Sequence, residues 1–141
     1  MIEQIYEDRW GEVFDRPSAD LIELRWFDTN AEMSAGEFQS WLKNFAECVE
    51  KCGRSRVLVD STAFRMSPAK MDGPWRDANI IPRYNAAGVT RFAFLVPDGS
   101  PGTVESGVAP AVDGPPNFPT GWFSSRERAY QWLADADQRE R

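Results

Sequence analysis

The chain has 141 residues, a formal net charge of -6 and no histidine. This length is typical of one domain, so we treat residues 1–141 as a single unit. The net acidity and the scattered Arg and Lys residues exclude a broad basic surface, and we expect no nucleic-acid partner. The lack of histidine excludes every catalytic triad that depends on a His base.

The start of the chain is acidic from Glu3 onward, and the longest apolar run covers only residues 92–96. A signal peptide begins with basic residues before an apolar segment, and a membrane span needs about 20 apolar residues. We therefore predict a cytoplasmic protein without a signal peptide or a membrane span. We also predict that it uses no cofactor.

The first part of the chain predicts a small hairpin followed by a strand. Apolar and polar residues alternate over 2–6 and 12–14, on either side of a turn that contains Gly11. Residues 21–27 alternate in the same way, with apolar side chains on one face and Glu23 and Arg25 on the other. This second pattern predicts a half-exposed strand near an edge of the sheet.

The clearest helix is predicted between Ser34 and Gly53. Ser34 and Glu37 have the spacing of a capping box, and apolar residues follow at helical intervals. Cys48 and Cys52 belong to this helix, where a spacing of four residues leaves their Cβ atoms about 5 to 6 Å apart. We expect two reduced thiols at the boundary of the core, with a redox pair as the alternative.

Two short apolar runs predict the centre of an α/β sheet. Residues 56–60 hold three consecutive aliphatic side chains, and residues 91–96 repeat the pattern. Such strands need cover on both faces, which helices on each side of a parallel or mixed sheet provide. Asp60 ends the first strand at its carboxyl edge, where ligands of open α/β sheets bind.

A broken helix is predicted over residues 68–87, interrupted near Gly73 and ended by Gly88. Continuous helical spacing places Met71, Trp75, Ala78 and Pro82 on one face, and Ile80 with Tyr84 on the other. We interpret Met71 and Trp75 as core residues. Ile80 and Tyr84 either fill the core, line a pocket closed by the 97–117 loop, or form the two-fold interface of a homodimer.

Residues 97–117 contain five prolines and four glycines. So long an irregular segment is a lid, a binding loop or a tolerated insertion. Residues 118–123 predict a last strand at an edge of the sheet, because Pro119 and Gly121 weaken it. Ser124 and Glu127 predict the start of a final helix, with a buried stripe formed by Ala129, Trp132, Leu133 and Ala136.

Four segments together resemble a known family: Val-Leu-Val-Asp at 57–60, Pro-Arg-Tyr-Asn-Ala-Ala-Gly-Val at 82–89, Arg-Phe-Ala-Phe at 91–94, and Trp-Phe-Ser-Ser-Arg-Glu-Arg-Ala-Tyr-Gln-Trp-Leu at 122–133. Over roughly residues 20–135 the chain resembles the SpoIIAA-like, STAS/SEC14-type family of small bacterial α/β proteins. The resemblance implies a mixed, largely parallel sheet of about five strands flanked by helices.

The resemblance also implies a class of function. STAS proteins are non-enzymatic regulators, and some are switched by phosphorylation of a serine at the start of the helix after the central strand. Ser67 matches this position, although residues 64–68 read Phe-Arg-Met-Ser-Pro where the family has Asp-Ser-Ser-Gly. The SEC14-like proteins imply binding of a lipophilic molecule.

We therefore predict a non-catalytic domain that binds a small apolar ligand or a regulatory protein near the carboxyl edge of the sheet. A ligand would occupy an apolar cavity under residues 97–117, and the candidate ligand-binding residues are Phe64, Met66, Trp75, Ile80, Tyr84 and Trp122. The alternative is a metal-assisted hydrolase or phosphotransfer enzyme in which Asp60 and Asp98 hold a hard cation. In the non-catalytic interpretation these two carboxylates cap turns.

Overall fold

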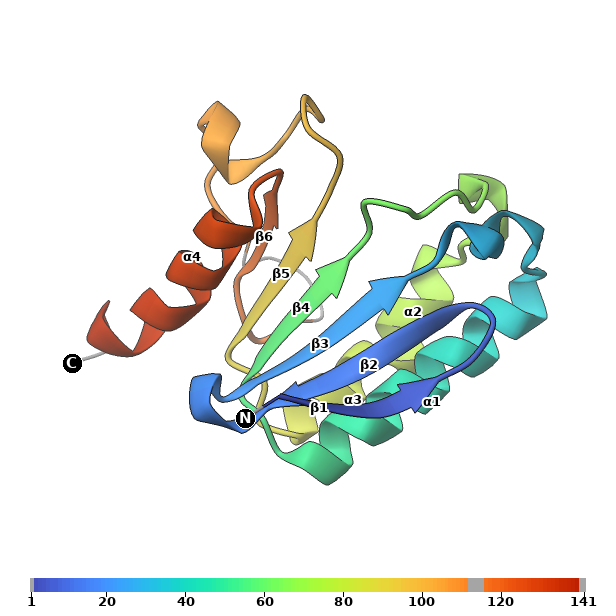
Figure 1. Cartoon of the computed structure of the whole chain (residues 1–141), viewed down its shortest axis with the longest axis horizontal. Coiled ribbons are helices and arrows are strands. Elements are labelled where there is room, and N and C mark those ends of the chain that lie inside the picture. Colours follow the sequence, from blue (N-terminus) through green and yellow to red (C-terminus); the bar gives the residue numbers. More distant parts are fainter. Residues whose placement is uncertain (1, 112–115, 140–141) are drawn as a thin grey trace.

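The computed structural model describes residues 2–111 and 116–139. These residues form a six-stranded sheet in the order β1-β2-β3-β4-β5-β6, shown in Figure 1. The strands are β1 (Glu3–Glu7), β2 (Gly11–Arg16), β3 (Leu21–Trp26), β4 (Arg56–Asp60), β5 (Arg91–Leu95) and β6 (Thr120–Phe123). The hairpin β1–β2 and the pair β2–β3 are antiparallel, and β3 to β6 are parallel. The predicted mixed α/β sheet is confirmed, with six strands in place of about five.

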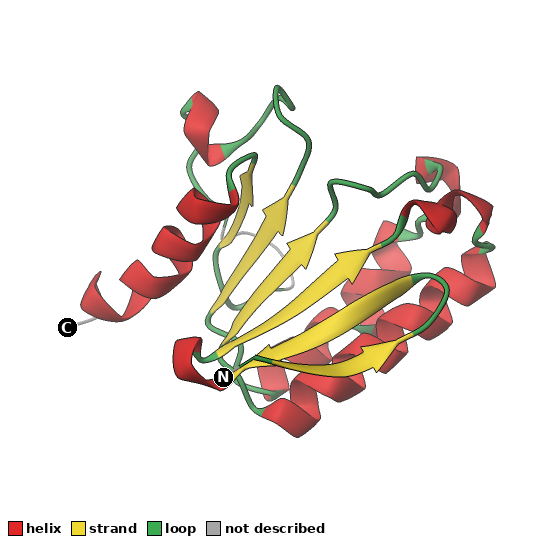
Figure 2. Cartoon of the chain, in the orientation of Figure 1, coloured by secondary structure: helices red, strands yellow, loops and turns green. Residues whose placement is uncertain are grey.

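Helices cover both faces of the sheet, as Figure 2 shows. On one side lie α1 (Ala35–Cys52), α2 (Gly73–Asn79) and α3 (Ile81–Ala86), and on the other lies α4 (Arg126–Arg139). Short 3-10 turns are η1 (Pro17–Ala19), η2 (Asp28–Glu32), η3 (Pro68–Lys70) and η4 (Val104–Ser106). Within the described residues, no helix is long and apolar enough to cross a membrane.

The two central strands lie side by side, as predicted. Leu58 of β4 is paired with Ala93 of β5, and every residue of β4 is buried. Val57 and Val59 face the larger core, under α1 to α3, and Leu58 faces the smaller core, under α4. The consecutive aliphatic residues are therefore explained by cover on both faces.

Helix α1 begins and ends as predicted. The Ser34 Oγ accepts a hydrogen bond from the Glu37 backbone N–H at 3.1 Å, and the Glu37 carboxylate accepts one from the Ser34 N–H at 2.9 Å. Gly53 ends the helix with a φ of 68°, a conformation that glycine adopts without strain. Cys48 and Cys52 are free and half-buried, and burial raises the pKa of both thiols. Protonated thiols are poor nucleophiles, so the redox alternative gains no support.

The prediction that β3 is a half-exposed strand near the edge was wrong. Strand β3 lies between β2 and β4, and the Glu23 side chain is fully buried. Alternation did separate the two faces correctly, because Ile22 and Leu24 belong to the larger core. The charged face is covered because the start of α4 packs over it and supplies Arg126 and Tyr130 as partners for Glu23.

The predicted faces of the broken helix were also wrong. Ile80 and Tyr84 are buried in the larger core, whereas Met71 is 41% exposed and Ala78 and Pro82 are exposed. The reason is a break in the backbone at Ile80, with φ of -111° and ψ of -49°, which separates α2 from α3 and resets the helical phase. The predicted interruption near Gly73 is present between η3 and α2, but the break at Ile80 was not predicted. Ile80 and Tyr84 cannot form a dimer interface, and a homodimer through another surface stays a prediction.

The part of the 97–117 loop around η4 packs beside the start of α4, whereas the Asn117 N–H donates to the Asn85 Oδ1 of α3 at 2.8 Å. The Glu105 carboxylate of η4 accepts hydrogen bonds from the backbone N–H groups of Ser124 at 2.7 Å and Ser125 at 3.0 Å. The Ser125 Oγ in turn accepts a hydrogen bond from the Arg128 N–H at 3.3 Å, so Ser125 caps α4 and Ser124 does not. Residues 112–115 of this loop, and the predicted burial of Ala136, lie outside the described residues.

Candidate functional site

An apolar cavity of about 540 Å³ lies between the sheet and the helices on its α1 side. We call it the aromatic cavity. Its sheet wall comes from β3, β4, β5 and β6, and its helical wall comes from α1, α3, the start of α2 and the segment that leads from β4 to α2. This volume is within the range of sites that bind small molecules.

Aromatic rings form much of the wall. On the sheet, Phe94 of β5 stacks on Trp122 of β6, with ring centroids 5.6 Å apart and planes inclined by 11°. Trp26 of β3 meets Phe64 edge-on, at a centroid distance of 5.5 Å, and approaches Phe38 of α1 at 5.8 Å. Trp122 is 37% exposed, so it stands where the cavity opens to solvent. Rigid, flat walls of this kind favour a flat or flexible apolar guest.

Few polar groups line the aromatic cavity. Asp72 precedes α2, and its carboxylate accepts a hydrogen bond from the Trp75 N–H at 3.0 Å. Arg76 lies one turn further on, with its guanidinium carbon 5.8 Å from the ring centroid of Phe92 and 5.9 Å from that of Phe94. Burial raises the pKa of Tyr84 to about 12, so its hydroxyl stays protonated at neutral pH. The cavity therefore combines apolar walls with one cation, one carboxylate and the hydroxyls of Ser61 and Tyr84.

Three of the six predicted ligand-binding residues line this cavity: Phe64, Tyr84 and Trp122. The other three do not line it. Met66 and Ile80 are buried in the same core, and Trp75 is half-buried beside the Lys43 ammonium group, 5.7 Å from the ring centroid. The cavity lies near the carboxyl edge as predicted. No described residue of the 97–117 loop lines it, so the predicted cover by that loop gains no support from the described residues.

Sequence reasoning missed several residues of the site. Trp26, Phe38, Phe92 and Phe94 were not among the candidate ligand-binding residues, and Arg76 was not singled out. One signal was available, because Phe92 and Phe94 alternate along β5 and therefore share a face. Placing Arg76 over that face required the position of α2, which the sequence pattern did not give.

The structure gives no support to a metal site at Asp60. The buried Asp60 carboxylate pairs with Arg126, lies 3.6 Å from the Arg25 Nε, and accepts a hydrogen bond from the Thr62 hydroxyl at 2.6 Å. Asp98 is exposed in the turn after β5. Within the described ranges, no three Cys, Asp or Glu side chains are placed to share a metal ion. Asp60 caps a turn and anchors a helix, which is the non-catalytic interpretation of this residue.

Ser67 lies exposed at the start of η3. Its Oγ accepts a hydrogen bond from the Ala69 N–H at 3.3 Å, and its carbonyl accepts one from the Lys70 N–H at 3.0 Å. The chain then continues into residues 71–73, which line the aromatic cavity. Phosphorylation of Ser67 stays a prediction.

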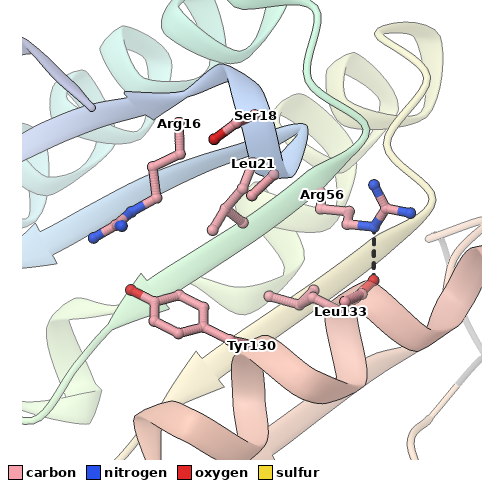
Figure 3. Close-up of a pocket in the computed structure, with 8 residues that line it drawn as sticks. Arg16, Ser18, Leu21, Arg56, Tyr130 and Leu133 are labelled. Atoms are coloured by element: carbon pink, nitrogen blue, oxygen red, sulfur yellow. Dashed lines mark hydrogen bonds between the residues drawn. The ribbon is translucent and has the colours of Figure 1, made fainter. Parts of the chain in front are cut away.

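A second cavity, of about 390 Å³, lies on the other face of the sheet between η1 and α4. Figure 3 shows its lining, with Tyr130 and Leu133 of α4 facing Arg16 and Leu21. The Arg56 Nε donates to the Leu133 carbonyl at 2.6 Å, and Arg16 binds the Glu23 carboxylate at 3.0 Å. The Arg56 hydrogen bond holds α4 onto the sheet and the Arg16 ion pair joins β2 to β3, so both cations already have partners within the fold and this cavity is the weaker candidate for a ligand site.

Comparisons of the chain with protein-family models, with curated proteins and with solved structures found no match. The coordinates establish an α/β domain with an aromatic cavity. Membership of the SpoIIAA-like family stays a prediction. The function must therefore be inferred from the residues and shape of the aromatic cavity.

Proposed function

We propose that the chain is a non-catalytic binding domain whose aromatic cavity takes up a small apolar ligand. The size and lining of the cavity carry the proposal. It is walled by side chains such as Trp26, Phe64, Phe94 and Trp122, and Asp72 and Arg76 are the charged residues among those that line it. Charged groups do not converge there as they would around a hydrolytic centre.

The apolar walls of the cavity favour an apolar ligand over water. Protein interiors contain few voids larger than a water molecule, and water needs two to four polar partners to be held in one. Apolar walls offer few such partners. An apolar molecule would instead make dispersion contacts with the rings on both sides and remove their surface from water.

The buried part of the cavity wall also favours a small molecule over a regulatory protein, which was the other predicted partner. The part of the cavity walled by Phe45 and Phe92, which are buried, is out of reach of a protein surface. A regulatory role fits the resemblance to the STAS/SEC14-type proteins, with Ser67 as the candidate phosphorylation site. We also propose a cytoplasmic location, which the two free cysteines support.

The proposal is tested by titrating the protein into N-phenyl-1-naphthylamine, a neutral apolar dye that becomes fluorescent when it leaves water. The wild-type protein should give a saturable rise. Ser61 lines the aromatic cavity, so Ser61→Trp should fill it and weaken binding by on the order of tenfold or more. Ser18 lines the second cavity, so Ser18→Trp is the matched control and should bind the dye as the wild type does.

Thermal unfolding of both variants shows whether they remain folded. A wild-type protein that gives no saturable rise would contradict the proposal. So would a folded Ser61→Trp variant that binds the dye with wild-type affinity.

A further inference from the structure

We propose that the ligand is an amphipathic acid whose single carboxylate binds Arg76 and Tyr84 at one end of the aromatic cavity. This inference rests on the proposed function, because it specifies the ligand of the same cavity. It is carried by two of the polar groups that line the cavity, neither of which has a hydrogen-bond or ion-pair partner within the described residues.

The first group is the guanidinium of Arg76. It lies over the ring faces of Phe92 and Phe94, and among the described residues none accepts a hydrogen bond from it or forms an ion pair with it. Ring faces attract a cation but satisfy none of its five N–H donors in the way that oxygen does. A half-buried arginine in this state is suited to an anionic guest, because carboxylates match the fork of its N–H groups.

The second group is the hydroxyl of Tyr84. The side chain is 1% exposed and lines the aromatic cavity, and no described residue exchanges a hydrogen bond with its hydroxyl. Buried tyrosine hydroxyls normally have a hydrogen-bond partner. The pKa of about 12, which burial produces, keeps this hydroxyl a donor at neutral pH.

Both side chains lie near the ring of Phe92. The Tyr84 and Phe92 rings have centroids 5.5 Å apart, and the Arg76 guanidinium carbon is 5.8 Å from the Phe92 centroid. The positive charge of Arg76 also acts on the ionisation of Tyr84, where it opposes the raised pKa. One oxygen-bearing group of a ligand placed at Phe92 therefore has two donors within its surroundings.

The charges of the lining set the charge of the ligand. Arg76 and Asp72 are its charged residues, and the Asp72 carboxylate already accepts the N–H of Trp75 at the start of α2. Asp72 is exposed to solvent, which screens its charge, whereas Arg76 is half-buried. A monoanion such as a carboxylate fits Arg76, whereas a neutral ligand offers it no charge-assisted hydrogen bond.

The test compares two ligands that differ only at the polar end. Decanoate and decanol, both below the concentration at which decanoate forms micelles, compete with bound N-phenyl-1-naphthylamine in the fluorescence assay. The wild-type protein should prefer decanoate by on the order of tenfold. The pair 2-naphthoate and 2-naphthalenemethanol repeats the comparison with an aromatic body and separates aliphatic from aromatic acids as the better guest.

Arg76→Met should abolish the preference for the acid, measured as the ratio of the two displacement constants within the variant, and Arg76→Lys should restore part of it. Tyr84→Phe should lower the preference by several-fold, because it removes one donor and keeps the ring. Arg128→Met is the matched control. It removes the same charge from an exposed position on α4, on the far face of the sheet, and should keep the wild-type preference.

The outcomes separate this inference from the proposed function. Dye binding with equal displacement by acid and alcohol would overturn the inference and leave the proposed function standing. A preference for the acid that persists in Arg76→Met would also overturn the inference and leave the proposed function standing. A wild-type protein that does not bind the dye or either ligand would overturn both.

Discussion

The Arg126 guanidinium donates a hydrogen bond to the Glu23 carboxylate at 2.7 Å, although the two residues are 103 positions apart in the chain. This contact ties the first turn of α4 to the middle of β3. Tyr130 adds a hydrogen bond to the same carboxylate at 2.7 Å, and Arg126 also pairs with Asp60 at the end of β4. Helix α4 is thereby fixed across the neighbouring strands β3 and β4, and it covers the charged face of the sheet.

Replacing Arg126 with Met should therefore destabilise the fold. The fully buried Glu23 would keep Arg16, Arg25 and Tyr130 as partners but lose its shortest ion pair, and Asp60 would lose its nearest cation. We expect a loss of about 2 to 3 kcal/mol, measured by urea unfolding. Arg128→Met on the exposed side of α4 should change the free energy of unfolding by less than about 0.5 kcal/mol. Equal effects of the two substitutions would show that the buried ion pairs of Arg126 add no more to the free energy of unfolding than an exposed arginine does.

The same network predicts how stability depends on acid. Burial alone would raise the pKa of Glu23, but the hydrogen bonds from Tyr130 and Arg126 and the nearby positive charges outweigh burial and lower it. The unfolded chain then binds the proton more readily than the folded one, with an unfolded pKa of about 4.3. Stability from Glu23 is present above about pH 5 and is lost as the pH falls through the lower, folded pKa.

Urea unfolding between neutral pH and pH 3 tests this sign. The free energy of unfolding of the wild type should fall as the pH is lowered toward 3. Glu23→Gln should be less stable at neutral pH, and its free energy of unfolding should fall less steeply, because it lacks the carboxyl group that takes up the proton. Identical acid slopes in the two proteins would mean that the pKa of Glu23 is the same in the folded and unfolded states.

Two tyrosines give a matched comparison. The Tyr130 hydroxyl donates to the Glu23 carboxylate, whereas the Tyr84 hydroxyl has no hydrogen bond to a described residue. Tyr130→Phe should cost about 1 to 2 kcal/mol, and Tyr84→Phe should change the free energy of unfolding by less than about 0.5 kcal/mol. Both are measured on the protein without ligand. A larger cost at Tyr84 would mean that its hydroxyl is bonded within the fold and is not available to a ligand.

Two glycines should respond oppositely to alanine. A Cβ at Gly11 would lie 2.8 Å from the Arg25 carbonyl oxygen on the neighbouring strand, so Gly11→Ala should destabilise by about 1 to 3 kcal/mol. A Cβ at Gly36 in α1 meets no atom within 4 Å, so Gly36→Ala should stabilise by up to about 1 kcal/mol. Thermal unfolding midpoints measure both. A neutral Gly11→Ala would argue against the close approach of β2 and β3.

Local patterns predicted most of the elements. The Ser34 capping box, the aliphatic run before Asp60 and the break near Gly73 each act through neighbouring residues, and each is present in the structure. Alternation also assigned the faces of β3 correctly. It could not tell that a helix from the far end of the chain covers the charged face, because Arg126 reaches Glu23 only in the folded chain.

The site was harder to predict for the same reason. The helical phase was carried through Ile80, where the backbone breaks, so Tyr84 was assigned to the face opposite the one that reaches the sheet. The 97–117 loop was expected over the cavity because of its length and composition. Its described part contacts the start of α4 through Glu105, a pairing that no local pattern encodes. Phe64, Tyr84 and Trp122 were nevertheless among the predicted ligand-binding residues.

The most direct test of the aromatic cavity uses the indole N–H signals of the six tryptophans in a heteronuclear NMR titration with N-phenyl-1-naphthylamine. Trp26 and Trp122 line the cavity, whereas Trp132 packs against Phe123 and Arg91 on the α4 side. The signals of Trp26 and Trp122 should shift in a saturable way, and that of Trp132 should stay in place. Shifts at Trp132 without shifts at Trp26 and Trp122, or no saturable shift at all, would contradict a ligand site between α1, α2 and the sheet.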